Sequence, residues 1–127
     1  SGWSALCYAT DRGHHEVTSL LLRAGASATI RGKDGRNALI LAASNYFSLS
    51  CLRILLEHGR QNINDQDDSG RTALAWACYW ANFEGAKLLL AYGADHTIAD
   101  AKGRTPKMIA KKEDHDACVG LIEVGPP

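Results

Sequence analysis

A chain of 127 residues, of which 46% are hydrophobic and 22% charged, is long enough to bury the core of one ordinary folded domain. Fourteen basic residues balance fourteen acidic ones, so we expect neither nucleic acid nor an anionic membrane surface as a partner. The longest apolar runs are far shorter than the roughly 20 residues that a membrane-spanning helix needs.

The four cysteines are too far apart in the sequence to supply a zinc site with the usual spacing of two to four residues between ligands. We expect them to be buried, reduced thiols, which fits an intracellular protein of the cytoplasm or the nucleus. They are Cys7, Cys51, Cys78 and Cys118.

The first of four similar units, residues 1–33, is predicted to hold two helices. Ser4 in "SGWSALCYAT" precedes an apolar helical pattern and has a side-chain oxygen that can cap the first turn. The second helix is expected to end in "LLLRAGA", where Gly25 supplies a left-handed conformation without a Cβ clash.

The same two signals return in the second unit, residues 34–68, and in the third, residues 69–101. Asn37 and Thr72 are the expected N-caps, and Gly59 and Gly93 the expected left-handed residues after the second helices. The second unit carries two extra residues, one of them near "NYFSLS" (45–50). We therefore expect its inter-helix turn to bulge.

The fourth unit, residues 102–124, begins with the expected N-cap Thr105 and is polar on its outer side, as a terminal capping repeat should be. A short tail, residues 125–127, follows. The first unit has no such polar face, so we expect further repeats or a cap upstream in the natural protein. Its apolar N-terminal face also predicts weak self-association.

Four anchoring glycines, Gly2, Gly35, Gly70 and Gly103, are separated by 33, 35 and 33 positions. With two helices per unit, essentially the whole chain resembles the ankyrin repeat family, whose unit of about 33 residues is a β-turn and two antiparallel helices. The family's Thr-Pro-Leu-His box appears here as "SALC", "NALI", "TALA" and "TPKM", without the histidine. The resemblance implies an all-α ankyrin repeat solenoid over residues 1–127, with a protein-binding concave groove.

Enzyme motifs fail at specific positions. "HHEVTS" (14–19) begins like a zinc protease helix but has Ser19 where the second histidine should be, and "GASATIRGKD" (25–34) lacks the spacing of a phosphate-binding loop. His14 and His115 occupy a repeat position at which ankyrin repeats often have a structural histidine. We expect no catalysis, no cofactor and no metal.

The segment "RTALAWACYWAN" (71–82) places Trp76, Tyr79 and Trp80 three and four residues apart on one helical face. In ankyrin repeats this part of the first helix borders the concave groove, and the equivalent residues of the other units vary. Aromatic side chains dominate the energetics of interfaces. The alternative is that Trp76 packs under a neighbouring helix and only Trp80 is exposed.

The residue after each anchoring glycine is Trp3, Arg36, Arg71 or Arg104, which predicts a row of arginines along one edge. Such an edge suits a peptide with an apolar anchor and acidic residues; alternatively, each arginine is a solvated turn residue. Phe47 beside Tyr46 extends the expected surface. The residues expected to bind the partner are Trp3, Tyr8, Arg12, Arg36, Asn45, Tyr46, Arg71, Trp76, Tyr79, Trp80 and Arg104.

A non-catalytic protein-interaction module is therefore the predicted function. An alternative is a methyl-lysine reader, in which Trp76, Tyr79 and Trp80 enclose a methylammonium group by cation–π attraction. Against this alternative, the nearest residue of the predicted edge is an arginine rather than an acidic residue.

Overall fold

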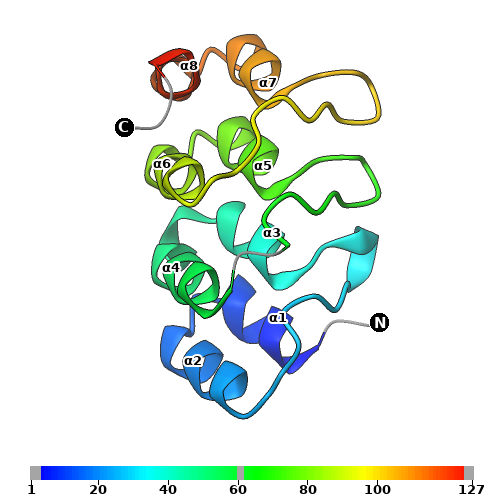
Figure 1. Ribbon diagram of the computed structural model, residues 1–127, viewed down its shortest axis with the longest axis vertical. Coiled ribbons are helices and arrows are strands. Elements are labelled where there is room, and N and C mark those ends of the chain that lie inside the picture. The colour runs from blue at the N-terminus through cyan, green and yellow to red at the C-terminus, as the bar shows by residue number, and fades with distance from the viewer. Residues whose placement is uncertain (1–3, 60–61, 125–127) are drawn as a thin grey trace.

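The computed structural model describes residues 4–59 and 62–124. These residues form four helix pairs stacked in one row (Figure 1). The helices are α1 (Ala5–Asp11), α2 (His15–Arg23), α3 (Ala38–Ala43), α4 (Leu49–His58), α5 (Ala73–Tyr79), α6 (Phe83–Ala91), α7 (Pro106–Lys112) and α8 (Asp116–Val124), with short 3-10 turns η1 (Lys33–Gly35) and η2 (Tyr46–Ser48).

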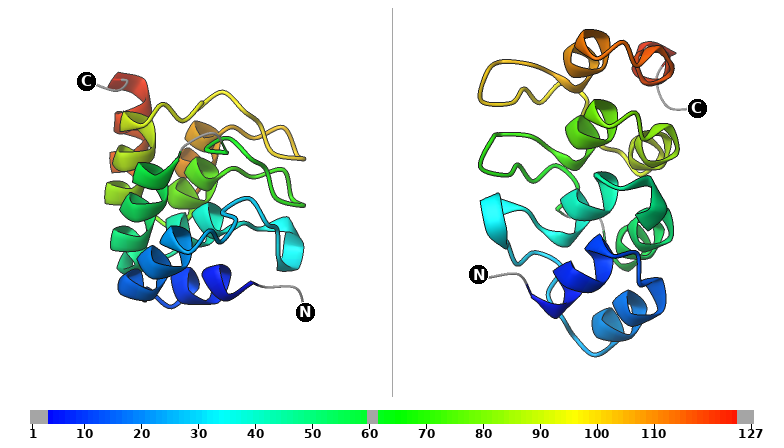
Figure 2. Two further views of the ribbon diagram at one scale, coloured as in Figure 1. Left: turned by 60° about the horizontal axis from the view of Figure 1, so that its bottom comes forward. Right: turned by 180° about the vertical axis from the view of Figure 1, so that it is seen from behind.

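The first helices of the pairs, α1, α3, α5 and α7, pack on one another in chain order, and so do the second helices. The finger loops, which link α2 to α3, α4 to α5 and α6 to α7, project together on one side of the stack (Figure 2). The described residues contain no strand. The prediction of an all-α repeat solenoid is confirmed.

Each first helix begins with the predicted cap. In every case the cap side chain accepts a hydrogen bond from the backbone N–H three residues later, which satisfies a donor that the first helical turn leaves free. The pairs are Ser4 with Cys7 (3.2 Å), Asn37 with Ile40 (2.9 Å), Thr72 with Ala75 (3.2 Å) and Thr105 with Met108 (3.4 Å).

At the ends of the second helices, the predicted left-handed conformation is confirmed for two of the three glycines. Gly25 and Gly93 are left-handed, with φ of 96° and 95°. The prediction for Gly59 is wrong, because its φ of 173° is extended backbone. Helix α4 continues to the residue directly before Gly59, which therefore occupies the C-cap, whereas Gly25 and Gly93 lie one residue beyond theirs.

Adjacent units are also joined by a recurring hydrogen bond at the inter-helix turns. A side chain before each later second helix bonds a carbonyl near the end of the preceding first helix, where helical carbonyls lack partners. The bonds are Ser48 Oγ to Thr10 O (2.9 Å), Asn82 Nδ2 to Ala43 O (3.0 Å) and His115 Nδ1 to Cys78 O (2.8 Å). The structural role expected of His115 is thereby confirmed.

The turn between α3 and α4 is longer than the other inter-helix turns and contains η2, which confirms the predicted bulge. All four cysteines are buried and free, as expected.

Candidate protein-binding surface

Trp76, Tyr79 and Trp80, the aromatic cluster, lie on α5 and its C-cap and form one continuous contact. The rings of Trp76 and Tyr79 meet edge to face with centroids 5.5 Å apart, and those of Tyr79 and Trp80 do so at 4.9 Å. Trp76 and Tyr79 are half-buried, whereas Trp80 is 55% exposed. Trp80 therefore offers the largest surface of the three to a partner.

Trp76 is held by the protein itself. Its indole Nε1 donates a 2.7 Å hydrogen bond to Asp67 Oδ2, and the guanidinium groups of Arg36 and Arg71 each lie 4.7 Å from its ring centroid. Arg71 also lies 4.9 Å from the ring centroid of Tyr79. Cations at these distances attract the negative faces of aromatic rings. Helix α5 is thus connected to two finger loops, the one between α2 and α3 and the one between α4 and α5.

The three arginines of the predicted edge are ion-paired with two aspartates of the finger loops. Arg36 Nε lies 3.6 Å from Asp67 Oδ2, and Asp100 Oδ2 lies 3.4 Å from Arg71 Nε and 3.2 Å from Arg104 Nε. They are therefore not solvated turn residues without partners.

Burial separates these arginines into two kinds. The Arg71 side chain is 10% exposed, whereas those of Arg36 and Arg104 are 31% and 28% exposed. The sequence predicted three arginines available along one edge, but Arg71 is enclosed by Trp76, Tyr79 and Asp100. Arg71 therefore has little surface left for a partner. The buried Nε of Arg36 has no hydrogen-bond acceptor within range among the described residues.

Both aspartates are stabilised as anions. Burial raises the pKa of Asp67. Hydrogen bonds from Ser69, Trp76 and the Arg71 amide together lower it by more than burial raises it, so the pKa lies below its ordinary value. Burial likewise raises the pKa of Asp100, and bonds from the Arg104 and Lys102 amides and from the Arg71 side chain bring it below the ordinary value.

Asp67 and Asp100 are not among the residues that the sequence predicted for this surface. A signal was present, because each lies three residues before an anchoring glycine, Gly70 or Gly103. The corresponding position of the first finger loop is Gly32. Arg36 consequently has no aspartate at this position of its own finger and pairs with Asp67 of the next one.

A second group of predicted residues meets the aromatic cluster at Trp80. A surface pocket is lined by Ser44, Asn45, Tyr46, Phe47 and Trp80, so the bulged turn after α3 lies beside the end of α5. Tyr46 and Phe47 are both exposed, and their rings meet edge to face at 6.4 Å. We call this the uncharged pocket.

Trp80 also forms the wall of another pocket, on the side of the fourth unit. Tyr79, Trp80, Glu113 and His115 line it, which brings the turn between α7 and α8 next to the end of α5. We call this the carboxylate pocket. Trp80 therefore separates two concave surfaces of different chemistry.

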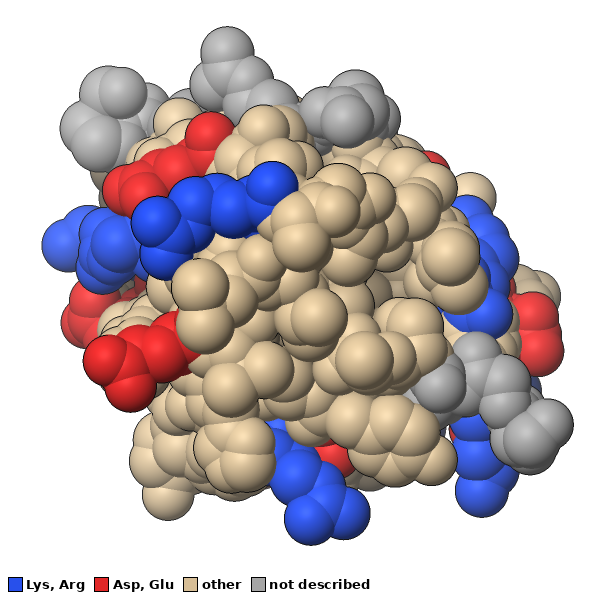
Figure 3. Space-filling view, turned by 90° about the horizontal axis from the view of Figure 1, so that it is seen from below, with Lys and Arg blue, Asp and Glu red and all other residues tan. Residues whose placement is uncertain are grey.

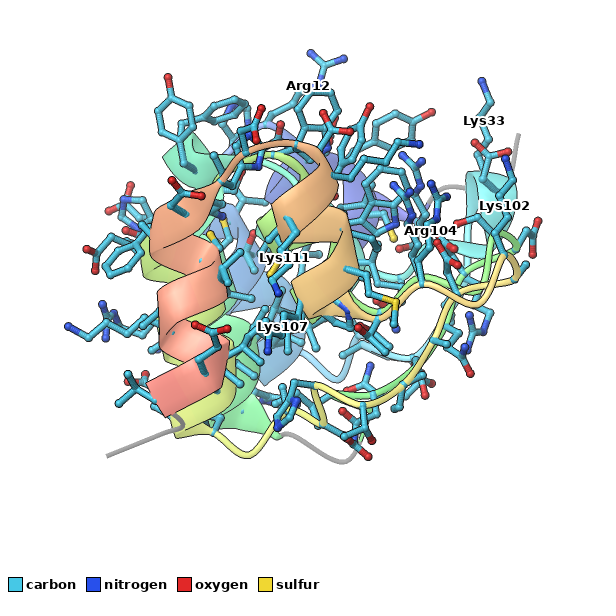
Figure 4. All side chains as sticks on the ribbon, turned by 90° about the horizontal axis from the view of Figure 1, so that it is seen from above. Arg12, Lys33, Lys102, Arg104, Lys107 and Lys111 are labelled. Atoms are coloured by element: carbon cyan, nitrogen blue, oxygen red, sulfur yellow. The ribbon has the colours of Figure 1, made fainter. Side chains whose placement is uncertain are left out.

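The remaining predicted residues lie elsewhere. Tyr8 on α1 and Arg12 at its C-cap are exposed in the first unit. Seen along the stack, Arg12 lies at the edge of the inter-helix turns, whereas Arg104 lies towards the finger loops (Figure 4). Trp3 is outside the described residues.

The end of the stack formed by the first unit exposes apolar side chains that later units bury. Val17 on α2 is 46% exposed, whereas Cys51 at the equivalent position of α4 is 0% exposed. This end face is largely uncharged at its centre, with Lys, Arg, Asp and Glu near its margin (Figure 3).

Among the residues that the structure describes, no group of three or more His, Cys, Asp or Glu residues lies close enough together to hold a metal ion. No helix of this part of the chain has both the length and the apolar character to cross a bilayer.

Comparison with known proteins identifies the repeats. The family model described as ankyrin repeats (3 copies) matches residues 6–100 and 62–125.

The chain is 36% identical over 111 residues to the B-cell lymphoma 3 protein homolog of Mus musculus, covering 87% of this chain and 24% of that protein. It is 44% identical over 86 residues to the Ankyrin repeat and LEM domain-containing protein 1 homolog of Caenorhabditis elegans, covering 68% and 12%. Inversin of Mus musculus is 35% identical over 104 residues, covering 81% and 10%. The chain thus spans a quarter or less of the length of these relatives.

Proposed function

The chain belongs to the ankyrin repeat family, and on this premise we propose that it is a non-catalytic module that binds a segment of a partner protein in its concave groove. Ankyrin repeats are in general protein–protein interaction modules. In this chain the groove is the surface along the exposed faces of the first helices, from the finger loops to the inter-helix turns.

The exposure of Trp80 between two pockets is the observation that carries the proposal. A tryptophan that is 55% exposed at the end of a helix contributes less to the core than a buried one, yet it offers a large, rigid contact area. Tyr46 and Phe47 extend this area across the uncharged pocket. Tryptophan and tyrosine are enriched among the residues that dominate binding energy. We therefore place the apolar anchor of the partner at Trp80.

The accessible arginines supply the edge of the proposed site. Arg36 and Arg104 are partly exposed, and their ion pairs with Asp67 and Asp100 hold them in defined orientations. Within these ion pairs the three arginines, Arg71 included, outnumber the two aspartates by one positive charge. An acidic group on the partner would complement this excess.

The methyl-lysine alternative is less well supported. A cage built from Trp76, Tyr79 and Trp80 needs open ring faces. The guanidinium groups of Arg36 and Arg71 already lie over Trp76, and that of Arg71 lies over Tyr79. A methylammonium group there would have to displace these guanidinium groups.

A random peptide library displayed on phage tests the proposed function. Peptides selected on the wild-type domain should bind the Trp80→Ala variant about thirtyfold more weakly, the effect of losing a hot-spot residue. The matched control is Met108→Ala, which truncates an exposed apolar side chain of α7 that lines neither pocket. Selected peptides that bind wild type, Trp80→Ala and Met108→Ala equally would contradict the proposal.

Weak self-association through the N-terminal face is a separate part of the proposal. Its support is the exposure of Val17 at a position that is buried in the second unit. Sedimentation should show a dimer whose population rises with concentration in the wild type and disappears in Val17→Glu. Met108→Glu, at the opposite end of the stack, is the control. A wild type that stays monomeric at millimolar concentration would refute this part.

A further inference from the structure

The carboxylate pocket contains one acidic side chain. Glu113, at the C-cap of α7, is exposed and takes part in none of the ion pairs found among the described residues. It lines the pocket together with the rings of Tyr79 and Trp80. A carboxylate is an obligate hydrogen-bond acceptor when it is ionised. Its natural complement is a donor that carries positive charge.

His115 adds a second acceptor. Its Nδ1 lies 2.8 Å from the carbonyl oxygen of Cys78, and because a carbonyl oxygen only accepts, Nδ1 must carry the hydrogen. In the neutral imidazole the other nitrogen, Nε2, is then an acceptor. The pocket thus combines a carboxylate, a ring nitrogen that can accept and two aromatic side chains.

The aromatic wall favours a cation over a neutral donor. Arg36 and Arg71 stack on Trp76 and Tyr79, and Trp80 lies outside both of these contacts. The Trp80 ring is therefore available to a cation from outside the chain, and tryptophan is the best aromatic partner for one. Lys112 directly precedes Glu113 but does not line the pocket.

Resting on the proposed function, we propose that the carboxylate pocket receives a lysine or arginine side chain of the bound partner segment. The uncharged pocket on the other side of Trp80 receives the neighbouring apolar side chain. The two pockets share Trp80 as a wall, so the basic and the apolar residue lie close together in the partner sequence. The partner is thus a segment with an adjacent apolar and basic residue, and its acidic residues face the finger loops.

Peptides selected from the phage library on the wild-type domain provide the test. They should be enriched in Lys or Arg next to a large apolar residue. Glu113→Gln should weaken their binding about two- to fivefold, the range expected for the loss of an exposed ion pair. Glu57→Gln, which changes an exposed carboxylate on α4, should leave their affinity unchanged.

Charge exchange makes the test specific. Replacing the basic residue of a selected peptide by Gln should weaken binding to the wild type more than it weakens binding to Glu113→Gln, because that variant has already lost the carboxylate and keeps only the cation–π contact with Trp80. A peptide with Glu in place of its basic residue should bind Glu113→Lys better than it binds the wild type. Circular dichroism melts establish that both variants at this exposed turn are folded.

The outcomes separate the two proposals. Peptides that depend on Trp80 but carry no basic residue, or that bind Glu113→Gln as well as the wild type, overturn the cation pocket and leave the proposed function standing. Acidic residues enriched beside the apolar anchor also overturn it. A selection that yields no peptide dependent on Trp80 overturns both.

Discussion

The indole nitrogen of Trp76 donates a hydrogen bond to the carboxylate of Asp67 over 2.7 Å, and this bond separates the roles of two tryptophans that lie four residues apart. Trp76 connects α5 to the finger loop that precedes it, whereas Trp80 is mostly exposed between two pockets. One tryptophan therefore supports the surface that the other presents.

Trp76→Phe should reduce the free energy of unfolding by about 1–3 kcal/mol, because it leaves Oδ2 of the buried Asp67 carboxylate without a hydrogen-bond donor. Urea unfolding measures this loss. Trp80→Phe is the control and should be nearly neutral. Equal losses in the two variants would show that the bond to Asp67 adds no stability.

Leu55→Ala should cost roughly 2–5 kcal/mol of unfolding free energy, because Leu55 on α4 is almost fully buried and its loss leaves a cavity. Trp80→Ala should cost much less, since its side chain is largely in solvent in the folded state. Thermal or urea unfolding of both variants checks this difference. A loss of comparable size for Trp80→Ala would place Trp80 in the core.

Ala81→Gly should raise the free energy of unfolding by about 0.5–1 kcal/mol. Ala81 follows Trp80 and has a φ of 59°, a left-handed conformation that costs a residue with a Cβ atom and costs glycine little. Gly13 takes the corresponding conformation in the first inter-helix turn. Ala91→Gly, in the last turn of α6, is the control and should be destabilising. A destabilised Ala81→Gly would mean that the turn is not strained.

Acid should remove stability through Asp67 and Asp100. Their folded pKa values lie below the ordinary 3.8, so their contribution is fully present well above that pH and is lost as the pH falls through it towards the folded values. Urea midpoints between pH 7 and pH 3 should therefore fall, and Asp100→Asn should be less stable at pH 7 but lose less on acidification. Asp114→Asn, at an exposed turn residue, should follow the wild-type profile. A parallel fall for wild type and Asp100→Asn would contradict this account.

Partner binding should respond differently to aromatic and basic residues. Trp80→Ala should cost about 2 kcal/mol or more of binding free energy, mostly through faster dissociation. Arg104→Ala should mainly slow association and reduce its dependence on salt. Association and dissociation rates of a selected peptide at two salt concentrations distinguish the two effects. An Arg104→Ala variant with unchanged association and salt dependence would exclude Arg104 from the edge.

The repeat and its helices were predictable from the sequence because their signals are local. A cap such as Thr72 bonds an amide three residues away, so the letters around it suffice to locate the start of α5. Gly59 marks the limit of this reasoning. The glycine was identified, but its conformation depends on where α4 stops, and α4 continues to His58, directly before it.

The arrangement of the candidate site was decided only by the tertiary structure. Periodicity placed Arg71 in a column of arginines, yet its burial follows from Asp100, which lies 29 residues further along the chain and reaches it from the next finger loop. Likewise, sequence spacing put Trp80 on a helical face, but Glu113 and Tyr46 become its neighbours only when three units stack. Side-chain contacts between units depend on how whole helices are placed relative to one another, and no local pattern of residues encodes that placement.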